Sequence, residues 1–436
     1  MVKPGSKAAY LLSFAALGVL CLFLSLNRHS KAGLFNYHAE VWADKAGYFV
    51  YLPAAWHYGF LASRFPEGMD TLCGNGFRLD LANDKVRTKY FYGTALMQAP
   101  FFLGADVVAA LTGHPRDGFS LPYQKAVNVA AVAWLIAALM LLWPLLRRRY
   151  GGQAALLALV AIFAGTNLYY YSIDETGMSH VYSFFLLAAW LGWTERLARH
   201  PDPGVILGVT GGLIAGLILV TRPSNVLFLP VVLFFHTGMW KDVGSRLKML
   251  LKPRVWMPAL AMAILVMIPQ LMYWRYLDGQ WLMDTYPGEG FHWMQPQLAR
   301  SWLAPMHGLL TYNPLYLLIL AAFIILLKTS PPEGIVIPLF FLAISWVSAA
   351  WWDPGFGCSF GGRNYTEYLA LFAFPLAAFV QRMEGWKPVY RHLLFGFGIL
   401  MIAWNLKLIY TFDECFPGTE PWDWEAFIRL LSSPTL

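Results

Sequence analysis

The chain has 436 residues, of which 58% are hydrophobic and only 13% are charged. A soluble protein carries roughly 25% charged residues, so the composition excludes a soluble globular enzyme and indicates an integral membrane protein. The net charge of +7 does not indicate nucleic-acid binding, because the basic residues are spread over short loops instead of forming one stripe.

We predict an all-α polytopic membrane protein in which residues 1–436 form one domain, and the first span is expected to be retained. Its apolar stretches approach or exceed the roughly 18 residues that cross a bilayer. The stretch 94–112 contains Gln98, Pro100 and Asp106, and we interpret it as a helix on the outer surface. The eleven predicted spans are, in chain order, 8–26, 124–146, 152–170, 180–197, 204–220, 226–240, 256–274, 313–327, 335–351, 367–381 and 392–410.

The distribution of Lys and Arg predicts the orientation. With the N-terminus inside, the inner loops hold 16 basic and five acidic residues. The large loops 27–123, 275–312 and 352–366 and the tail 411–436 then lie outside, and they are rich in Trp and Tyr, which favour the headgroup layer. Long loops on one side favour an enzyme with an outer site over a transporter with its site at the middle of the bilayer.

Three of the four cysteines, Cys73, Cys358 and Cys415, fall in predicted outer loops, and Cys21 lies within a span. A disulfide is permitted outside, and three cysteines allow one pair at most. The sequence leaves open whether a pair forms. No CxxC pair is present, which argues against a metal or redox site.

An acidic residue follows the first span. Asp44 lies in the segment DKAGYFVYLP, together with Tyr48 and Tyr51. A carboxylate at the membrane surface is a candidate general base for an acceptor hydroxyl. Glu40, four residues earlier, is the alternative base. Tyr51 is a candidate for substrate contact.

Three basic residues in separate outer segments are candidate ligands for a lipid phosphate. Lys89 lies in TKYFYG, before the predicted surface helix. Arg222 lies in TRPSN, a short turn between two spans, where a cation needs an anionic partner. Arg363 lies in CSFGGRNYTEY, where Gly361 and Gly362 allow the backbone to approach a ligand closely.

Two adjacent acids, Asp174 and Glu175, lie beside a hydrophobic run, where burial of charge is unfavourable. Either is a candidate for a second acid, and we favour Glu175. His180 begins the next span, and His307 lies in APMHGLLTYNP at the entrance of another. Both histidines are candidates for substrate contact.

Each of these residues also has an ordinary explanation, such as a solvated loop acid, attraction to headgroups or a turn between spans. Their shared predicted side favours a common site. Acids that activate an acceptor and cations that hold a phosphate are what transfer from a lipid phosphate needs. The residues that represent the six outer segments are Asp44, Lys89, Glu175, Arg222, His307 and Arg363.

These segments resemble those of the GT-C glycosyltransferases, among them the lipid A aminoarabinose transferases and the protein O-mannosyltransferases. DKAGY is similar to the Asp-Glu-x-x-Tyr segment after the first span, TKYFYGTAL to the Lys-Pro-Pro segment, and SIDETGMSH to the second acidic motif. Lys45 replaces the second acid of the first motif, and Tyr90 and Phe91 replace the two prolines. The resemblance implies surface helices in the first outer loop, Asp44 as base, and donor-site roles for Tyr48, Lys89 and Arg222.

The resemblance further implies an inverting transfer of a sugar from a polyprenyl-phosphate donor to a lipid, glycan or protein acceptor. It implies no obligatory cofactor or metal and leaves a divalent metal open. No glycine-rich nucleotide-binding loop is present, which argues against a nucleotide-sugar donor.

We therefore expect a multi-pass glycosyltransferase in a bacterial inner membrane, with a cytoplasmic N-terminus, a periplasmic site, and membrane lipids but no nucleic acid as partners. One alternative is a lipid or polyisoprenoid transporter or flippase. Another is a glycan ligase or polymerase that uses a lipid-diphosphate oligosaccharide. The sequence leaves the sugar, the acceptor and the oligomeric state open.

Overall fold

The structure, a computed structural model, describes residues 7–28, 33–200, 202–412 and 415–434. It is built of helices with one small antiparallel hairpin, β1 (Arg78–Asp80) and β2 (Lys85–Arg87). The longer helices are α1 (Lys7–Asn27), α5 (Gly93–Thr112), α6 (Leu121–Tyr150), α7 (Gly152–Ala164), α9 (His180–Arg199), α10 (Val205–Thr221), α12 (Trp240–Leu250), α13 (Pro253–Asp278), α16 (Tyr316–Thr329), α17 (Pro331–Ala350), α18 (Leu369–Met383) and α19 (Pro388–Ile409). The short helices are α2 (Asp44–Phe49), α3 (Tyr51–Pro53), α4 (Met69–Leu72), α8 (Asn167–Ile173), α11 (Val231–Phe234), α14 (Leu298–Leu303), α15 (Leu309–Tyr312) and α20 (Trp424–Ser432).

The helices confirm the all-α, multi-pass membrane class. Among the described residues, six helices are long and apolar enough to cross a membrane, or seven if the bent pair α7 and α8 is one span. Four shorter apolar helical segments accompany them. Every predicted span overlaps a helix, and the count of eleven stays a prediction. The helix α5, predicted to lie on the surface, also meets the criterion of length and composition.

Two predicted spans are interrupted. The stretch 152–170 is bent by 66° between α7 and α8, where Thr166 is extended and its side chain accepts a hydrogen bond from the Leu168 amide as an N-cap. The stretch 226–240 is not one helix. A 3₁₀ turn, Pro223–Phe228, is followed by the single turn of α11, and the chain becomes extended at Phe235.

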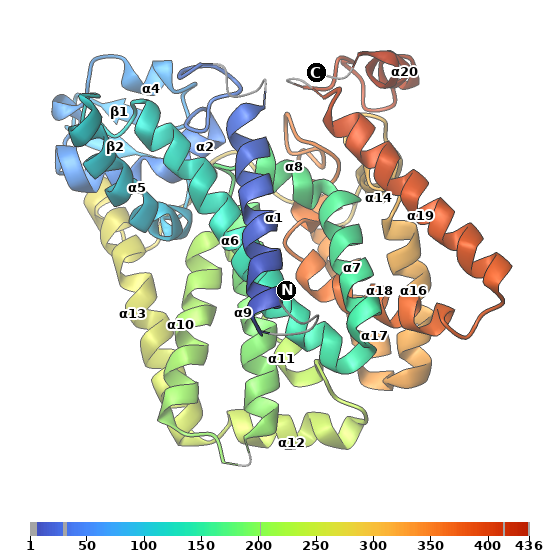
Figure 1. Ribbon diagram of the computed structural model, residues 1–436. Coiled ribbons are helices and arrows are strands. Elements are labelled where there is room, and N and C mark those ends of the chain that lie inside the picture. The colour runs from blue at the N-terminus through green and yellow to red at the C-terminus, as the bar shows by residue number, and fades with distance from the viewer. Residues whose placement is uncertain (1–6, 29–32, 201, 413–414, 435–436) are drawn as a thin grey trace.

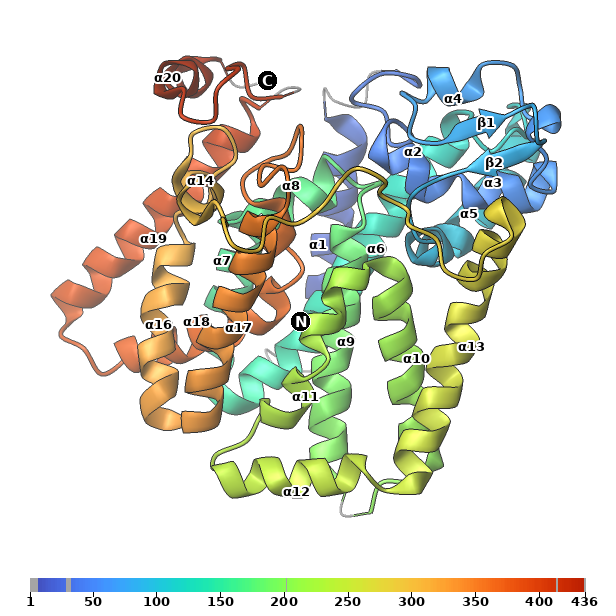
Figure 2. The same cartoon turned by 180° about the vertical axis from the view of Figure 1, so that it is seen from behind.

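The large loops gather at one end of the helix bundle. Figures 1 and 2 show α2, α4, the hairpin, α14 and α20 at that end, whereas α12 lies across the opposite end. The last turn of α6 carries three of the predicted inner basic residues. Arg148 donates to Glu195 at 2.9 Å, and Arg149 donates to Glu333 at 2.8 Å. The fold therefore separates the predicted outer loops from the predicted inner charges.

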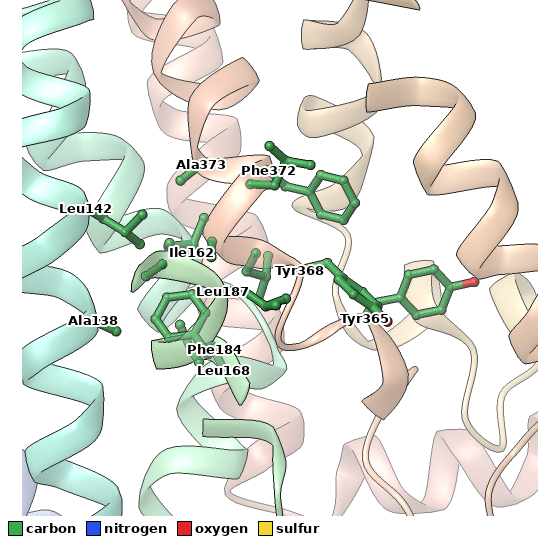
Figure 3. Close-up of a cluster of buried hydrophobic side chains, with 14 of the residues drawn as sticks. Ala138, Leu142, Ile162, Leu168, Phe184, Leu187, Tyr365, Tyr368, Phe372 and Ala373 are labelled. Carbon is green, nitrogen blue, oxygen red and sulfur yellow. The ribbon is translucent and has the colours of Figure 1, made fainter. Parts of the chain in front are cut away.

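A central core fixes the start of α18. Figure 3 shows side chains of α6, α7, α8 and α9 around Tyr365, Tyr368 and Phe372. The Tyr368 hydroxyl donates to Asn225 at 2.7 Å, and the Tyr365 hydroxyl donates to Ser345 at 3.0 Å. These buried tyrosines hold the 3₁₀ turn Arg363–Tyr365.

Two links fasten the loops at this end. A disulfide joins Cys358 to Cys415, which resolves the pairing that the sequence left open, and Cys21 and Cys73 are free and buried. The loop between α13 and α14 runs across the end of α17 (Figure 2), and the His292 amide donates to the Ala350 oxygen at 2.6 Å.

Candidate active site

The carboxylate of Asp44 is held at the start of α2 by a tightly packed turn. Ala43 has a positive φ of 48°, and its amide donates to the Cys73 carbonyl at 2.8 Å. A Cβ at Gly76 would lie 1.8 Å from the Ala43 oxygen, and one at Gly47 would lie 2.4 Å from the Gly76 oxygen. Only glycine fits at such approaches, so the two glycines fix the backbone that presents Asp44.

Among the described residues, Asp44 has two polar partners, each on one carboxylate oxygen. The Tyr90 hydroxyl donates to Oδ1 at 2.5 Å, and Nη2 of Arg363 lies 3.5 Å from Oδ2. The side chain of Asp44 is 39% exposed and that of Arg363 is 17% exposed. The carboxylate therefore remains accessible to a substrate while a cation lies beside it.

The two tyrosines of the Asp44 segment lie behind the carboxylate. The ring of Tyr48 packs on that of Tyr90 with centroids 4.3 Å apart, and the Ser179 hydroxyl donates to the Tyr48 oxygen at 3.3 Å. Tyr51 is buried, and its hydroxyl donates to the Tyr90 carbonyl at 2.6 Å. Tyr51 thus holds Tyr90 in place, and its burial keeps it away from the substrate contact that we expected from the sequence.

Arg222 is the centre of a second polar group. Its Nε lies 3.0 Å from Oε1 of Glu367, Nη2 donates to Asn364 at 2.9 Å, and Nη1 donates to Ser179 at 3.3 Å. Nδ1 of His180 lies 2.9 Å from the other oxygen of Glu367. His180 and Glu367 are fully buried, so the predicted contact of His180 with substrate is replaced by a contact with Glu367.

Arg363, which lies beside Asp44, and Arg222, which lies in the second polar group, act on the same tyrosine. Burial raises the pKa of Tyr286, the charge of Asp44 raises that pKa further, and the charges of Arg222 and Arg363 lower it. Ser179 contacts both Tyr48 and Arg222. The structure therefore brings Asp44, Arg222 and Arg363 into one neighbourhood.

Lys89 lies at the edge of this group. Its Nζ is 3.2 Å from Oε1 of Glu289 and 4.8 Å from the centroid of the Tyr286 ring. Glu289 also accepts from the Trp352 indole at 3.0 Å. A carboxylate and an aromatic face therefore hold this cation in place.

The two adjacent acids lie in different surroundings. Glu175 is 14% exposed and pairs with Lys45 at 3.0 Å. Burial raises the pKa of Tyr37, Glu175 raises it further, and Arg363 lowers it, so Glu175 and Arg363 act on the same hydroxyl. Asp174 is buried and pairs with Arg28.

Two other candidates contact residues other than Asp44. Glu40 is buried, and its Oε1 accepts from Asn128 at 2.8 Å. The ring of His307 packs against Gly355, and among the described residues its Nδ1 has no hydrogen-bond partner. Burial lowers the pKa of His307 to about 4, so this imidazole is neutral at pH 7.

A cavity of about 410 Å³ opens beside Asp44. Asp44, Lys89 and Tyr90 form part of its wall, and the hairpin with the turn before it forms the rest. Its volume is typical of small-molecule sites. The candidate base therefore faces a space that can receive a substrate.

Sequence reasoning missed several residues of the site. Tyr90 follows Lys89 directly, and Glu367 lies four residues after Arg363 in GRNYTEY, so both were within the quoted motifs. Tyr286 lies in a loop without a distinguishing pattern. A buried partner could have been expected for Arg222, because a cation between two spans needs an anion.

No protein-family model and no curated protein matches the sequence. The structure is similar to ArnT from Cupriavidus metallidurans bound to undecaprenyl phosphate, with 15% identity, a TM-score of 0.45, and coverage of 93% of this chain and 65% of ArnT. It is also similar to the oligosaccharyltransferase AglB from Archaeoglobus fulgidus in complex with an inhibitory peptide and a dolichol-phosphate, with 12% identity, a TM-score of 0.46, and coverage of 97% and 56%. The chain thus spans about two thirds or less of the length of these proteins. Both are GT-C glycosyltransferases, and similarity at this level does not specify a substrate.

Proposed function

We propose that the chain is a membrane glycosyltransferase that moves a sugar from a polyprenyl-phosphate donor to a hydroxyl of a lipid, glycan or protein acceptor. The observation that supports it most is the accessible carboxylate of Asp44 beside Arg363, with Arg222 in the same neighbourhood. Asp44 begins α2, which lies at the end of the bundle that carries the large loops (Figure 1). In the proposed orientation that end is the outer face of a bacterial inner membrane, and the N-terminus is cytoplasmic.

In the proposed reaction, the Asp44 carboxylate takes the proton of the acceptor hydroxyl as that oxygen attacks the anomeric carbon. The bond between the anomeric carbon and the phosphate oxygen breaks, and polyprenyl phosphate leaves as an anion. The transition state has oxocarbenium character, and the configuration is inverted. Each atom and proton is then accounted for without another reactant.

The cations of the site stabilise the leaving phosphate. Arg363 and Arg222 present planar guanidinium groups, which match phosphate oxygens in two-point contacts. Lys89 provides a third positive charge at the rim. Charge that develops on the phosphate in the transition state is stabilised most by groups already fixed in position, and Glu289 and Glu367 fix Lys89 and Arg222.

Glu175 is the second acid of the proposed site. Its carboxylate is partly exposed and pairs with Lys45. Carboxylate oxygens accept hydrogen bonds, so we assign Glu175 to contact with sugar hydroxyls and Asp174 to a structural pair with Arg28.

The test compares the two candidate bases. Purified protein in lipid nanodiscs is incubated with a defined polyprenyl-phosphate sugar and a membrane-lipid extract, and released polyprenyl phosphate is measured. Asp44→Asn is expected to lower the rate by at least about 100-fold, the range of general-base catalysis. Glu40→Gln, which changes a buried carboxylate outside the site, is the matched control and is expected to retain activity.

Equal release by wild type and Asp44→Asn would refute Asp44 as base. Movement of a lipid-linked sugar across the bilayer without release of polyprenyl phosphate would support the flippase alternative. Release of a lipid diphosphate from an oligosaccharide donor would support the ligase alternative, for which Arg222 and Arg363 provide two cations.

A further inference from the structure

The cavity beside Asp44 has a wall that does not include the two guanidinium groups assigned to the donor. Its lining includes Asp70, Asn75, Arg78, Thr88 and, at the rim, Lys89, but neither Arg222 nor Arg363. Asp44 lines this cavity and also lies beside Arg363. The cavity has no assigned ligand in the proposed reaction.

The wall is rigid. Gly74 and Asn75 both have a positive φ, of 64° and 56°, and Asn75 in that region is strained relative to glycine. A Cβ at Gly74 would lie 2.4 Å from the Trp42 ring. The amides of Thr71 and Leu79 donate to Asp70 at 3.0 and 2.9 Å, which fastens the turn to the hairpin.

One cation of this wall is not compensated. Arg78 and Arg87 face each other directly across the hairpin, and like charges in that position repel. Arg87 is neutralised by Asp80 at 3.0 Å and Asp278 at 2.9 Å. Arg78 is exposed, and in the part of the chain that the structure describes no carboxylate lies within 4 Å of it.

The other charges of the wall have partners. Lys89 pairs with Glu289, and the Asp70 carboxylate accepts two backbone amides. The guanidinium of Arg78 is therefore the group in this wall that gains most from a new anion. A phosphate or carboxylate would accept charge-assisted hydrogen bonds from it and relieve the repulsion with Arg87.

The chemistry of inversion assigns this side to the acceptor. In an inverting displacement the attacking oxygen and the leaving group lie on opposite faces of the sugar ring. If the phosphate leaves toward Arg222 and Arg363, the acceptor hydroxyl reaches Asp44 from the cavity. We infer that the cavity is the acceptor site and that the acceptor carries an anionic group, a phosphate or carboxylate, which Arg78 holds; this inference rests on the proposed function.

The test measures binding without turnover. Full-length protein in nanodiscs is titrated with glucose 6-phosphate, glucuronate and glucose as probes, by calorimetry or ligand-observed NMR. The two anionic sugars are expected to bind more tightly than glucose. Arg78→Gln is expected to weaken the binding of both anionic sugars by at least about tenfold, because a charge-assisted hydrogen bond is lost. It is expected to leave the binding of glucose unchanged.

The matched control is Arg64→Gln. Arg64 is an exposed arginine of the same outer region that does not line the cavity, and its substitution is expected to change none of the three affinities. Melting curves of both variants establish that the fold is retained. Equal affinity for glucose and glucose 6-phosphate, or equal affinity of wild type and Arg78→Gln for the anionic sugars, would overturn the inference.

Different results would refute the proposed transfer reaction and the proposed acceptor site. Binding of anionic sugars that depends on Arg78, without release of polyprenyl phosphate from any donor, would support the site and refute the transfer. Release of polyprenyl phosphate together with Arg78-independent binding would refute the site and leave the transfer standing.

Discussion

Nη2 of Arg363 lies 3.5 Å from Oδ2 of Asp44, although the two residues are 319 positions apart in the chain. The contact joins the first outer loop to the turn before α18. In the proposed reaction, a phosphate bound by Arg363 would therefore lie next to the carboxylate that accepts the proton. We propose that Arg363 both holds the leaving group and orients the base.

Substitution of Arg363 separates donor binding from folding. Arg363→Gln is expected to raise the KM for the lipid-phosphate donor by at least about tenfold, because a charged hydrogen bond is lost. Arg363→Lys is expected to raise this KM less, since lysine keeps the charge but not the planar guanidinium. Steady-state kinetics with varied donor measure both. Arg300→Gln, which removes another arginine–aspartate pair of 3.1 Å with Asp353 at the same end, is the control, and an equal effect of both glutamine variants would contradict the assignment.

Tyr90 is expected to act as a positioning residue for Asp44. Tyr90→Phe removes the hydroxyl that donates to Oδ1 at 2.5 Å and keeps the ring that packs on Tyr48. We expect kcat to fall by about tenfold with the donor KM unchanged, because a lost hydrogen bond of about 1.5 kcal/mol frees the carboxylate to rotate.

The control for Tyr90 is Tyr92→Phe, which removes a hydroxyl that donates to the Val266 carbonyl at 2.5 Å, away from the carboxylate. It is expected to leave both constants unchanged. A rise of KM with kcat unaltered in Tyr90→Phe would assign this hydroxyl to binding instead of positioning.

Loss of the ion pair between Arg222 and Glu367 is expected to lower both the melting temperature and the activity of the protein. Arg222→Gln leaves the buried carboxylate of Glu367 without its cation, which destabilises a protein by roughly 3–5 kcal/mol. The double variant Arg222→Gln with Glu367→Gln is expected to recover most of the melting temperature and none of the activity. Thermal unfolding of four proteins in nanodiscs, the wild type, both single variants and the double variant, measures this coupling, and additive effects would show that the two groups act independently.

His307 is expected to contribute to acid sensitivity. Burial lowers its pKa from 6.5 to about 4, so the unfolded chain takes up the proton first as the pH falls. Stability is then lost between pH 6.5 and 4, by up to about 3 kcal/mol. The melting temperature of His307→Gln, which cannot titrate, is expected to fall less than that of wild type over this interval, and parallel curves would refute the contribution.

The helices could be predicted from the sequence, for reasons that act locally. Apolar stretches of sufficient length must satisfy their backbone groups internally as helices. The direction of α6, which its basic end at Arg147, Arg148 and Arg149 indicates, stays a prediction. The break between α7 and α8 could not be predicted from hydropathy, because it depends on the cap that Thr166 provides.

The partners within the site could not be predicted, because they depend on contacts between distant segments. In the sequence, Tyr90 is only a departure from a motif, but its hydroxyl contacts Asp44, which lies 46 positions away in the chain. Glu367 and Arg222 meet only when α18 packs beside α9 and the turn after α10. The roles of Glu40 and Asp174 were left open for the same reason, since burial against Asn128 and Arg28 is a tertiary property.

The disulfide between Cys358 and Cys415 has a consequence for biosynthesis. Cys415 follows α19, so its thiol reaches the loop that carries Arg363 only after the ribosome has made α18 and α19 and both have entered the membrane. The loop that carries Arg363 is thus fastened only after α19 has been made. In a nascent chain stalled before that point, the carboxylate of Asp44 would be present while the loop that carries Arg363 is not yet held by the disulfide. Formation of the disulfide would therefore mark maturation of the protein.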